Sequence, residues 1–179
     1  MGETSEYAGR VLDALLSAHG AYYDVTRDYE FAGRLFPGYA EFHTHGERYV
    51  LSKKAKLWEV DAHEYLFFAV APFADGAAVA DLAAFATREG LAKVDPVPDH
   101  MTSYLTMVVI ADKVAPDVPA LVRRTRFRKN FRLGLRGWAD LRLAVIDLES
   151  GRVYTNGQGK EIKKSLEANL QKVQDRPVS

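Results

Sequence analysis

The sequence predicts a mixed α/β fold of the α+β class, with a single sheet of about six to eight strands, mixed or mainly antiparallel, covered by about four helices. Two observations lead to this prediction. Short apolar runs typical of strands recur along the chain, and longer stretches with helical spacing separate them. The 179 residues are also 47% hydrophobic, enough to bury one core. We expect one globular domain over residues 1–179, with a helix and strand meander (1–73), helix and strand-helix units (74–173) and a frayed tail (174–179).

The N-terminal part is expected to be one helix followed by strands. Apolar residues at helical spacing predict a helix over 5–18, with Thr4 as its N-cap and Gly20 as a left-handed C-terminal cap. Residues 22–36 are expected to be extended, and Pro37-Gly38 is typical of a turn. Four more extended segments are expected at 39–45, 48–52, 57–60 and 64–71, the last of them buried on both faces.

The second half alternates between helices and strands. Asp75 is a candidate N-cap for an alanine-rich helix over 75–89 that ends at Gly90. The other helices are expected at 116–124 and 160–173, with a loop at 93–100. Strands are expected at 103–111, 131–136, 140–148 and 152–155, and Ser150-Gly151 predicts a hairpin between the last two.

Composition excludes several classes of protein. The chain has no cysteine, so disulfides, thiolate nucleophiles and cysteine-based zinc sites are excluded. Its longest apolar run is strand-sized, well short of the ~20 residues that a membrane span needs. The N-terminus carries acids where a signal peptide has bases. We therefore expect a soluble, cytoplasmic protein with no membrane partner.

Residues 123–142 form a strongly basic stretch. They contain eight basic residues and one acid, so they carry a net charge of +7 and the rest of the chain carries −7. Guanidinium groups interleaved with aromatic rings are typical of phosphate binding, which predicts nucleic acid or a nucleotide as partner. The candidate anion-binding residues are Arg124, Arg126, Arg128, Lys129, Arg132 and Arg136, with Phe127 and Trp138 as stacking surfaces. The alternative is that these charges favour a helix C-terminus and form ion pairs with acids elsewhere.

A glycine-containing segment before the last helix is a second candidate. Gly157, Gly159 and Lys160 can present amide hydrogens and a positive charge to an anion at a helix N-terminus. The segment lacks the spacing of a Walker phosphate loop, so that mechanism is excluded. The alternative is an ordinary glycine turn. The two signals would reinforce each other if this segment lay beside the basic stretch.

A metal site is a further hypothesis. His43 and His45 lie two residues apart on an expected strand, so their imidazoles face the same side, and Asp61 and His63 lie at a nearby turn. This pattern predicts a metal-dependent hydrolase with a divalent ion; no other cofactor is predicted. A nuclease-like set of Asp147, Glu161 and Lys163 is disfavoured because residues two apart on a helix do not share a face.

A third hypothesis is an interaction module without catalytic activity. The basic stretch would then contact an acidic protein, or the acidic remainder of a second copy of the chain. The sequence leaves open whether the protein is an enzyme.

Overall fold

The computed structural model describes residues 4–43, 62–95 and 102–175. Within these ranges it contains four α-helices and one seven-stranded mixed sheet, which confirms the α+β class. None of the described helices is long and apolar enough to cross a membrane.

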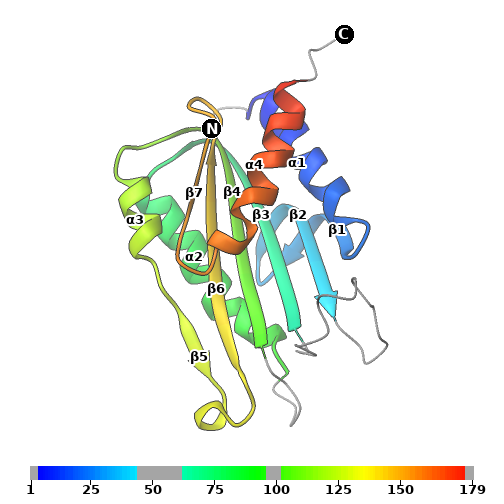
Figure 1. Ribbon diagram of the computed structural model, residues 1–179, viewed down its shortest axis with the longest axis vertical. Coiled ribbons are helices and arrows are strands. Elements are labelled where there is room, and N and C mark those ends of the chain that lie inside the picture. The colour runs from blue at the N-terminus through cyan, green and yellow to red at the C-terminus, as the bar shows by residue number, and fades with distance from the viewer. Residues whose placement is uncertain (1–3, 44–61, 96–101, 176–179) are drawn as a thin grey trace.

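The sheet has the order β1-β2-β3-β4-β6-β5, and β7 pairs with β6 (Figure 1). Three central strands are parallel to one another, namely β3 (Ala62–Ala74), β4 (Thr102–Val114) and β6 (Trp138–Asp147). Antiparallel strands flank them: β1 (Asp24–Phe31), β2 (Arg34–His43), β5 (Arg128–Asn130) and β7 (Arg152–Thr155). Their central position explains why β3, β4 and β6 are almost continuously apolar.

Helices cover both faces of the sheet (Figure 1). On one face α1 (Glu6–His19) and α4 (Lys160–Gln174) pack over Leu66, Val108 and Ile146. On the other face α2 (Gly76–Gly90) and α3 (Val118–Arg124) pack over a core that includes Phe67 and Leu105. The parallel pairs need crossover connections, and α2 and α3 lie in those connections on the same face.

Helix boundaries agree with the sequence to within about two residues, but two caps differ. Asp75 is the N-cap of α2 as predicted, since its carboxylate accepts a hydrogen bond from Ala78 N at 2.8 Å. Ser5, not Thr4, is the N-cap of α1, where its hydroxyl accepts from Ala8 N at 3.1 Å. Gly20 has φ −58° and is right-handed, so the predicted left-handed cap was wrong.

The turn predicted at Pro37-Gly38 was also wrong, because both residues lie inside β2. The chain reverses earlier, at Ala32 and Gly33, which have φ of 48° and 76°. Proline is tolerated in this strand because Pro37 forms no bridge on either side: the β1–β2 pairs pass from Arg27–Gly38 to Tyr29–Phe36 and leave Pro37 unbridged opposite Asp28, whose φ is 49°, and the pairs with β3 begin only at Gly38. Glycine at 38 lets α1 approach closely, since a Cβ there would lie 2.9 Å from Leu16 Cδ2.

The strand predicted at 131–136 was wrong. The β-bridged residues of this region are Arg128–Asn130, and Arg132–Gly134 form a short 3₁₀ turn. Arg132 and Leu133 both have positive φ, which breaks an extended pattern that the apolar alternation suggested. Leu133 is 99% exposed, so no core demands that alternation.

The connecting segments account for the remaining sequence predictions. The predicted strands at 48–52 and 57–60, the turn at Asp61 and most of the loop at 93–100 lie outside the described residues. Gly90 does not end the helical path, which continues as a 3₁₀ helix, η1 (Leu91–Lys93).

Tyr65 in β3 makes the folding stability of the protein depend on pH in the alkaline range. Burial, reinforced by Glu41 and Asp95, raises the pKa of Tyr65 from 10.0 to about 12, and its hydroxyl donates to Lys93 O at 2.8 Å. Between these values the unfolded chain releases a proton that the folded chain retains. We therefore expect stability to fall as pH rises above 10, with Tyr65 contributing about 1.4 kcal/mol per pH unit. Urea denaturation from pH 9 to 12 should show a shallower fall for Tyr65→Phe; an unchanged slope would contradict this assignment.

Candidate functional site

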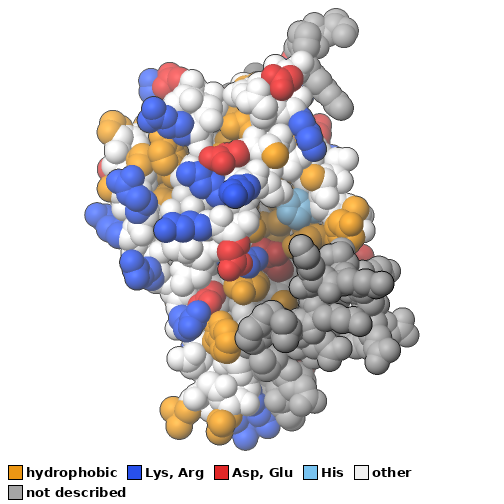
Figure 2. All heavy atoms as spheres, viewed as in Figure 1, with side chains coloured by type: hydrophobic (Ala, Val, Ile, Leu, Met, Phe, Trp, Pro, Cys, Tyr) orange, Lys and Arg blue, Asp and Glu red, His pale blue; other side chains and the backbone are white. Residues whose placement is uncertain are grey.

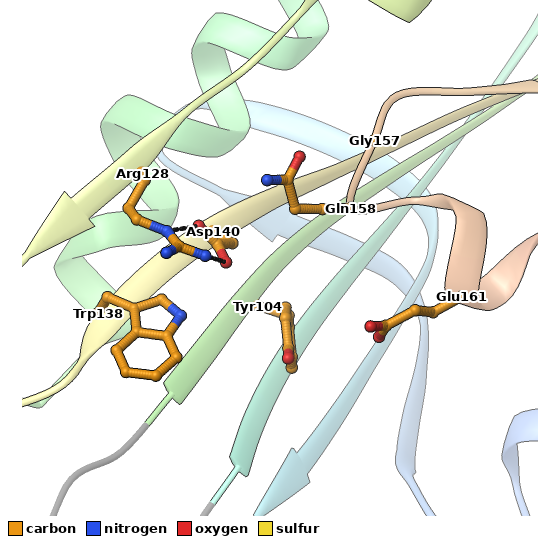
Figure 3. A pocket seen from close by; sticks show the side chains of 7 residues that line it. All are labelled: Tyr104, Arg128, Trp138, Asp140, Gly157, Gln158 and Glu161. Carbon is orange, nitrogen blue, oxygen red and sulfur yellow. Dashed lines mark hydrogen bonds and ion pairs between the residues drawn. The ribbon is translucent and has the colours of Figure 1, made fainter.

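A polar pocket lies at the β5 edge of the sheet, on the face that carries α4 (Figure 3). Its volume is about 250 Å³. The lining residues come from β4, β5, β6, the β7–α4 loop and α4, and they are Tyr104, Arg128, Trp138, Asp140, Gly157, Gln158 and Glu161. The pocket therefore brings the basic stretch together with the glycine segment, two candidates that the sequence left separate.

Arg128 and Asp140 form the wall of the pocket on the β5 side. Arg128 is opposite Asp140 in the β5–β6 register, and its Nε and Nη2 donate to the two carboxylate oxygens at 2.7 and 2.6 Å. The guanidinium carbon lies 5.2 Å from the centre of the Trp138 ring. The hydrogen bond to Asp140 raises the pKa of Arg128. Its charge is thus already matched by a buried carboxylate, although half of the Arg128 side chain (51%) is exposed.

Asn156 holds the glycine loop against the sheet. Strands β5 and β7 share one edge of β6 and leave a gap between them, which the buried Asn156 fills. Its Oδ1 accepts from Leu143 N and Gly159 N, and its Nδ2 donates to Leu141 O and Thr125 O. A side-chain amide here replaces the hydrogen bonds of a missing strand segment and fixes where the loop begins.

Close packing of the β7–α4 loop against β6 requires glycine at position 159. A Cβ at this position would lie 2.7 Å from Leu143 O, closer than real contacts allow. Because Gly159 N already donates to Asn156 Oδ1, this amide is engaged within the protein. Gly157 and Lys160 are exposed at the rim of the loop.

A buried ion pair lies beside the pocket. Arg142 and Glu64 have side chains only 9% and 8% exposed, and Arg142 Nη1 lies 3.2 Å from Glu64 Oε1. Arg142 also pairs with Glu161, and its guanidinium carbon is 3.4 Å from the centre of the Tyr104 ring. Thr106 completes the hydrogen bonding of Glu64 Oε1 at 2.6 Å.

Tyr23 contacts this ion pair from the α1 side. Its hydroxyl donates to Glu64 Oε2 at 2.6 Å, and burial, followed by the charge of Glu64, raises the pKa of Tyr23. Burial likewise raises the pKa of Tyr104, against the lowering effect of Arg142. A second hollow of about 340 Å³, between α1 and α4, is lined by Tyr23, Glu64 and Glu161 among others. The Arg142–Glu64 pair therefore lies between two hollows of one face.

Exposed basic side chains surround the first pocket on the β5 side. Figure 2 shows Lys and Arg side chains gathered over this half of the face. Besides Arg128, the exposed members at the end of α3, in the segment from 126 to 132 and on α4 are Arg123, Arg124, Arg126, Lys129, Arg132, Lys160 and Lys164. No carboxylate of a described residue forms an ion pair with any of these seven. The basic surface is thus only partly neutralised by internal pairs.

Two of the predicted anion-binding residues are placed differently from the rest. Phe127 is partly buried and packs against the core on the α2 face, so it is engaged away from the pocket. Arg136 is half-buried and already has an interaction within the protein.

Sequence reasoning did not assign several of the pocket residues to an anion-binding site. Tyr104, Asp140, Gln158 and Glu161 come from three separate segments, which only the fold brings together. The burial of Arg142 beside a partner could have been predicted, because a charged residue between two leucines in a buried strand must be paired.

The predicted metal ligands are only partly described. His43 and His63 are directly opposite each other in the β2–β3 register, a closer relation than the sequence implied. His45 and Asp61 lie outside the described residues. Among those that are described, no group of three or more potential ligands is assembled. The metal hydrolase remains a prediction.

Fold and site together define an α+β protein with a charged, aromatic-walled pocket at one edge of its sheet. The chain belongs to the family described as Domain of unknown function (DUF8052), whose model matches residues 8–168. No curated protein and no solved structure matches the chain.

Proposed function

We propose that this protein binds a phosphate-bearing partner, either single-stranded nucleic acid or a nucleotide, where the α3–β5 connection meets the β7–α4 loop. The observation behind the proposal is the pocket that combines Arg128 and Trp138 with Gly157 and Gln158. Phosphates would contact the exposed basic residues at its rim, and a base would occupy the pocket beside the indole of Trp138.

The rim residues suit phosphate recognition because they are exposed and no carboxylate within the described part of the chain forms an ion pair with them. Arg124 and Arg126 flank Thr125, whose carbonyl accepts from Asn156 Nδ2 at 3.3 Å. This contact brings the two arginines to the loop that ends at Lys160, in the first turn of α4. Guanidinium groups bind phosphate oxygens in pairs, and the positive end of the helix adds to the attraction.

The pocket itself suits a base more than a phosphate. Asp140 neutralises Arg128, and Glu161 pairs with Arg142, so the lining offers little uncompensated positive charge. Trp138 and Tyr104 provide aromatic surface, and Gln158 provides both a hydrogen-bond donor and an acceptor. Stacking on aromatic rings is typical of single-strand recognition.

Affinity for a short single-stranded oligonucleotide should fall steeply with salt. Each phosphate neutralised on a single strand contributes about 0.7 to the slope of log affinity against log salt concentration. Replacing Arg124, Arg126 and Lys160 together by glutamine should therefore reduce that slope by about 2. Fluorescence anisotropy between 50 and 300 mM salt measures both quantities.

Arg88→Gln is the matched control, because Arg88 is an exposed arginine on α2, which covers the other face of the sheet. It should leave both affinity and slope unchanged. Trp138→Leu should weaken binding at all salt concentrations without changing the slope. A flat salt response, or equal losses in the triple variant and the control, would refute the proposal.

A further inference from the structure

The ammonium group of Lys93 lies inside a cluster of aromatic rings on the α2 side of the sheet, away from the basic surface. Its Nζ is 5.0 to 5.7 Å from four ring centres, within the range of cation–π attraction. The rings come from β1, β2 and β3 and belong to Tyr29, Phe31, Tyr39 and Tyr65. We call this cluster the aromatic cage.

The aromatic cage is held in place by the sheet and not by the lysine. Tyr39 and Tyr65 are 2% and 4% exposed, and Phe67 packs 5.1 Å from Tyr39 between ring centres. Tyr29 stacks on Tyr39 with 4.1 Å between ring centres and 13° between ring planes. Because these rings support one another, the cage should persist when its occupant is changed.

The hydrogen bonding of Lys93 fits this site poorly. A primary ammonium group has three donors and is strongly hydrated. Here Glu41 Oε2, the carboxylate oxygen that pairs with it among the described residues, is 3.7 Å away and already accepts from the Tyr39 hydroxyl at 2.7 Å. No described residue accepts a hydrogen bond from Lys93 Nζ, although the side chain is only 17% exposed.

A methylated ammonium group has the properties that the aromatic cage offers. It carries the same positive charge, needs few or no acceptors, and presents apolar methyl groups to the ring faces. The Glu41 carboxylate at the rim supplies a compensating charge without demanding close contact.

We propose that the aromatic cage is a binding site for an N-methylated ammonium group and that Lys93 is its intramolecular occupant in the free protein. The site lies on the opposite face from the phosphate surface and takes a ligand of opposite charge, so it does not depend on the proposed function. Binding requires the ligand to displace the lysine side chain, which acts as a tethered competitor.

The test is a titration of Lys93→Ala and of the unsubstituted protein with tetramethylammonium chloride, followed by tyrosine fluorescence. Lys93→Ala should bind at least about tenfold more tightly, because a tethered competitor has an effective concentration of millimolar or more. Choline should also bind, whereas 3,3-dimethylbutan-1-ol, its uncharged analogue of equal shape, should bind much more weakly. Comparison of choline with N-acetyl-trimethyllysine amide distinguishes a small-molecule ligand from a peptide side chain.

Two further variants make the outcome decisive. Lys93→Met fills the aromatic cage without a charge and should bind tetramethylammonium less well than Lys93→Ala. Tyr39→Leu, added to Lys93→Ala, should abolish binding. If Lys93→Ala is less stable than the unsubstituted protein, tetramethylammonium should raise its Tm, whereas sodium chloride of equal concentration should not. Equal affinity in Lys93→Ala and the unsubstituted protein, equal affinity for choline and the alcohol, or no binding and no rise in Tm would each overturn the proposal.

Discussion

Replacing Arg142 by methionine should lower the free energy of unfolding by about 3–5 kcal/mol, because it leaves a buried carboxylate without its counter-ion. Glu64 is 6% exposed, and its ion-pair partner is Arg142. Methionine approximates the length of the arginine stem, so the change removes the charge while retaining most of the volume. Chemical denaturation at pH 7 measures the effect.

The reason for this magnitude is the asymmetry of buried ion pairs. Two charges removed from water lose much of their hydration, and their attraction in the interior approximately compensates for that loss. Removing one partner leaves the desolvation of the other uncompensated. Thr106 and Tyr23 still donate to Glu64, but hydrogen bonds from neutral hydroxyls do not replace a positive charge.

A double variant separates the loss of the Arg142–Glu64 attraction from the cost of leaving Glu64 buried without a counter-ion. Glu64→Leu combined with Arg142→Met removes both charges and should be less destabilising than Arg142→Met alone. Arg27→Met is the surface control, since the Arg27–Asp13 pair is 56% and 61% exposed and should contribute about 0–1 kcal/mol. A loss for Arg142→Met no larger than that for Arg27→Met would show that the pair is not buried as described.

Replacing Asn156 by alanine should lower the free energy of unfolding by about 3 kcal/mol. The substitution leaves Leu143 N and Leu141 O without their partners at the gap between β5 and β7, where water is excluded. Each unsatisfied buried group costs about 1–3 kcal/mol. Because the same side chain positions Gly159, oligonucleotide affinity should fall as well, even under conditions where the variant remains folded.

Asn169 provides the matched control for this prediction. It is also buried, at 8% exposure, but within the described residues its side chain makes a single hydrogen bond, from Nδ2 to Ser165 O within α4. Asn169→Ala should therefore be destabilising by only about 1 kcal/mol. Asn156→Asp should be as harmful as alanine, because the carboxylate retains the acceptor but loses both donated bonds and adds a buried charge. Equal effects at positions 156 and 169 would contradict the bridging role of Asn156.

The element types of this protein follow largely from local patterns. Asp75 is a cap in both sequence and structure, and the buried strands around Phe67, Val108 and Val145 are recognisable from apolar runs alone. The failures occur where long-range packing overrides a local signal. Pro37 continues a strand because it stands at an unbridged position of the ladder, opposite Asp28, and residues 132–135 form a turn because no core lies beneath Leu133 and Leu135.

The candidate site could be predicted only in part for the same reason. The basic stretch and the glycine segment were each visible, but their adjacency depends on Asn156, which hydrogen-bonds across the sheet edge. The pairing of Arg128 with Asp140 could not be predicted from the sequence either, because it depends on the β5–β6 register. The aromatic cage draws on three strands and a 3₁₀ turn, so no sequence window contains it.

Composition and periodicity thus determined the α+β class, the buried strands, the helices and the gathering of positive charge, because each of these depends on residues that are neighbours along the chain. Strand order, register and the choice of which arginines are neutralised were decided by the tertiary structure. The physical reason is that ion pairs, cation–π contacts and backbone hydrogen bonds act over a few ångströms, and only folding brings residues such as Glu64 and Arg142 within that range.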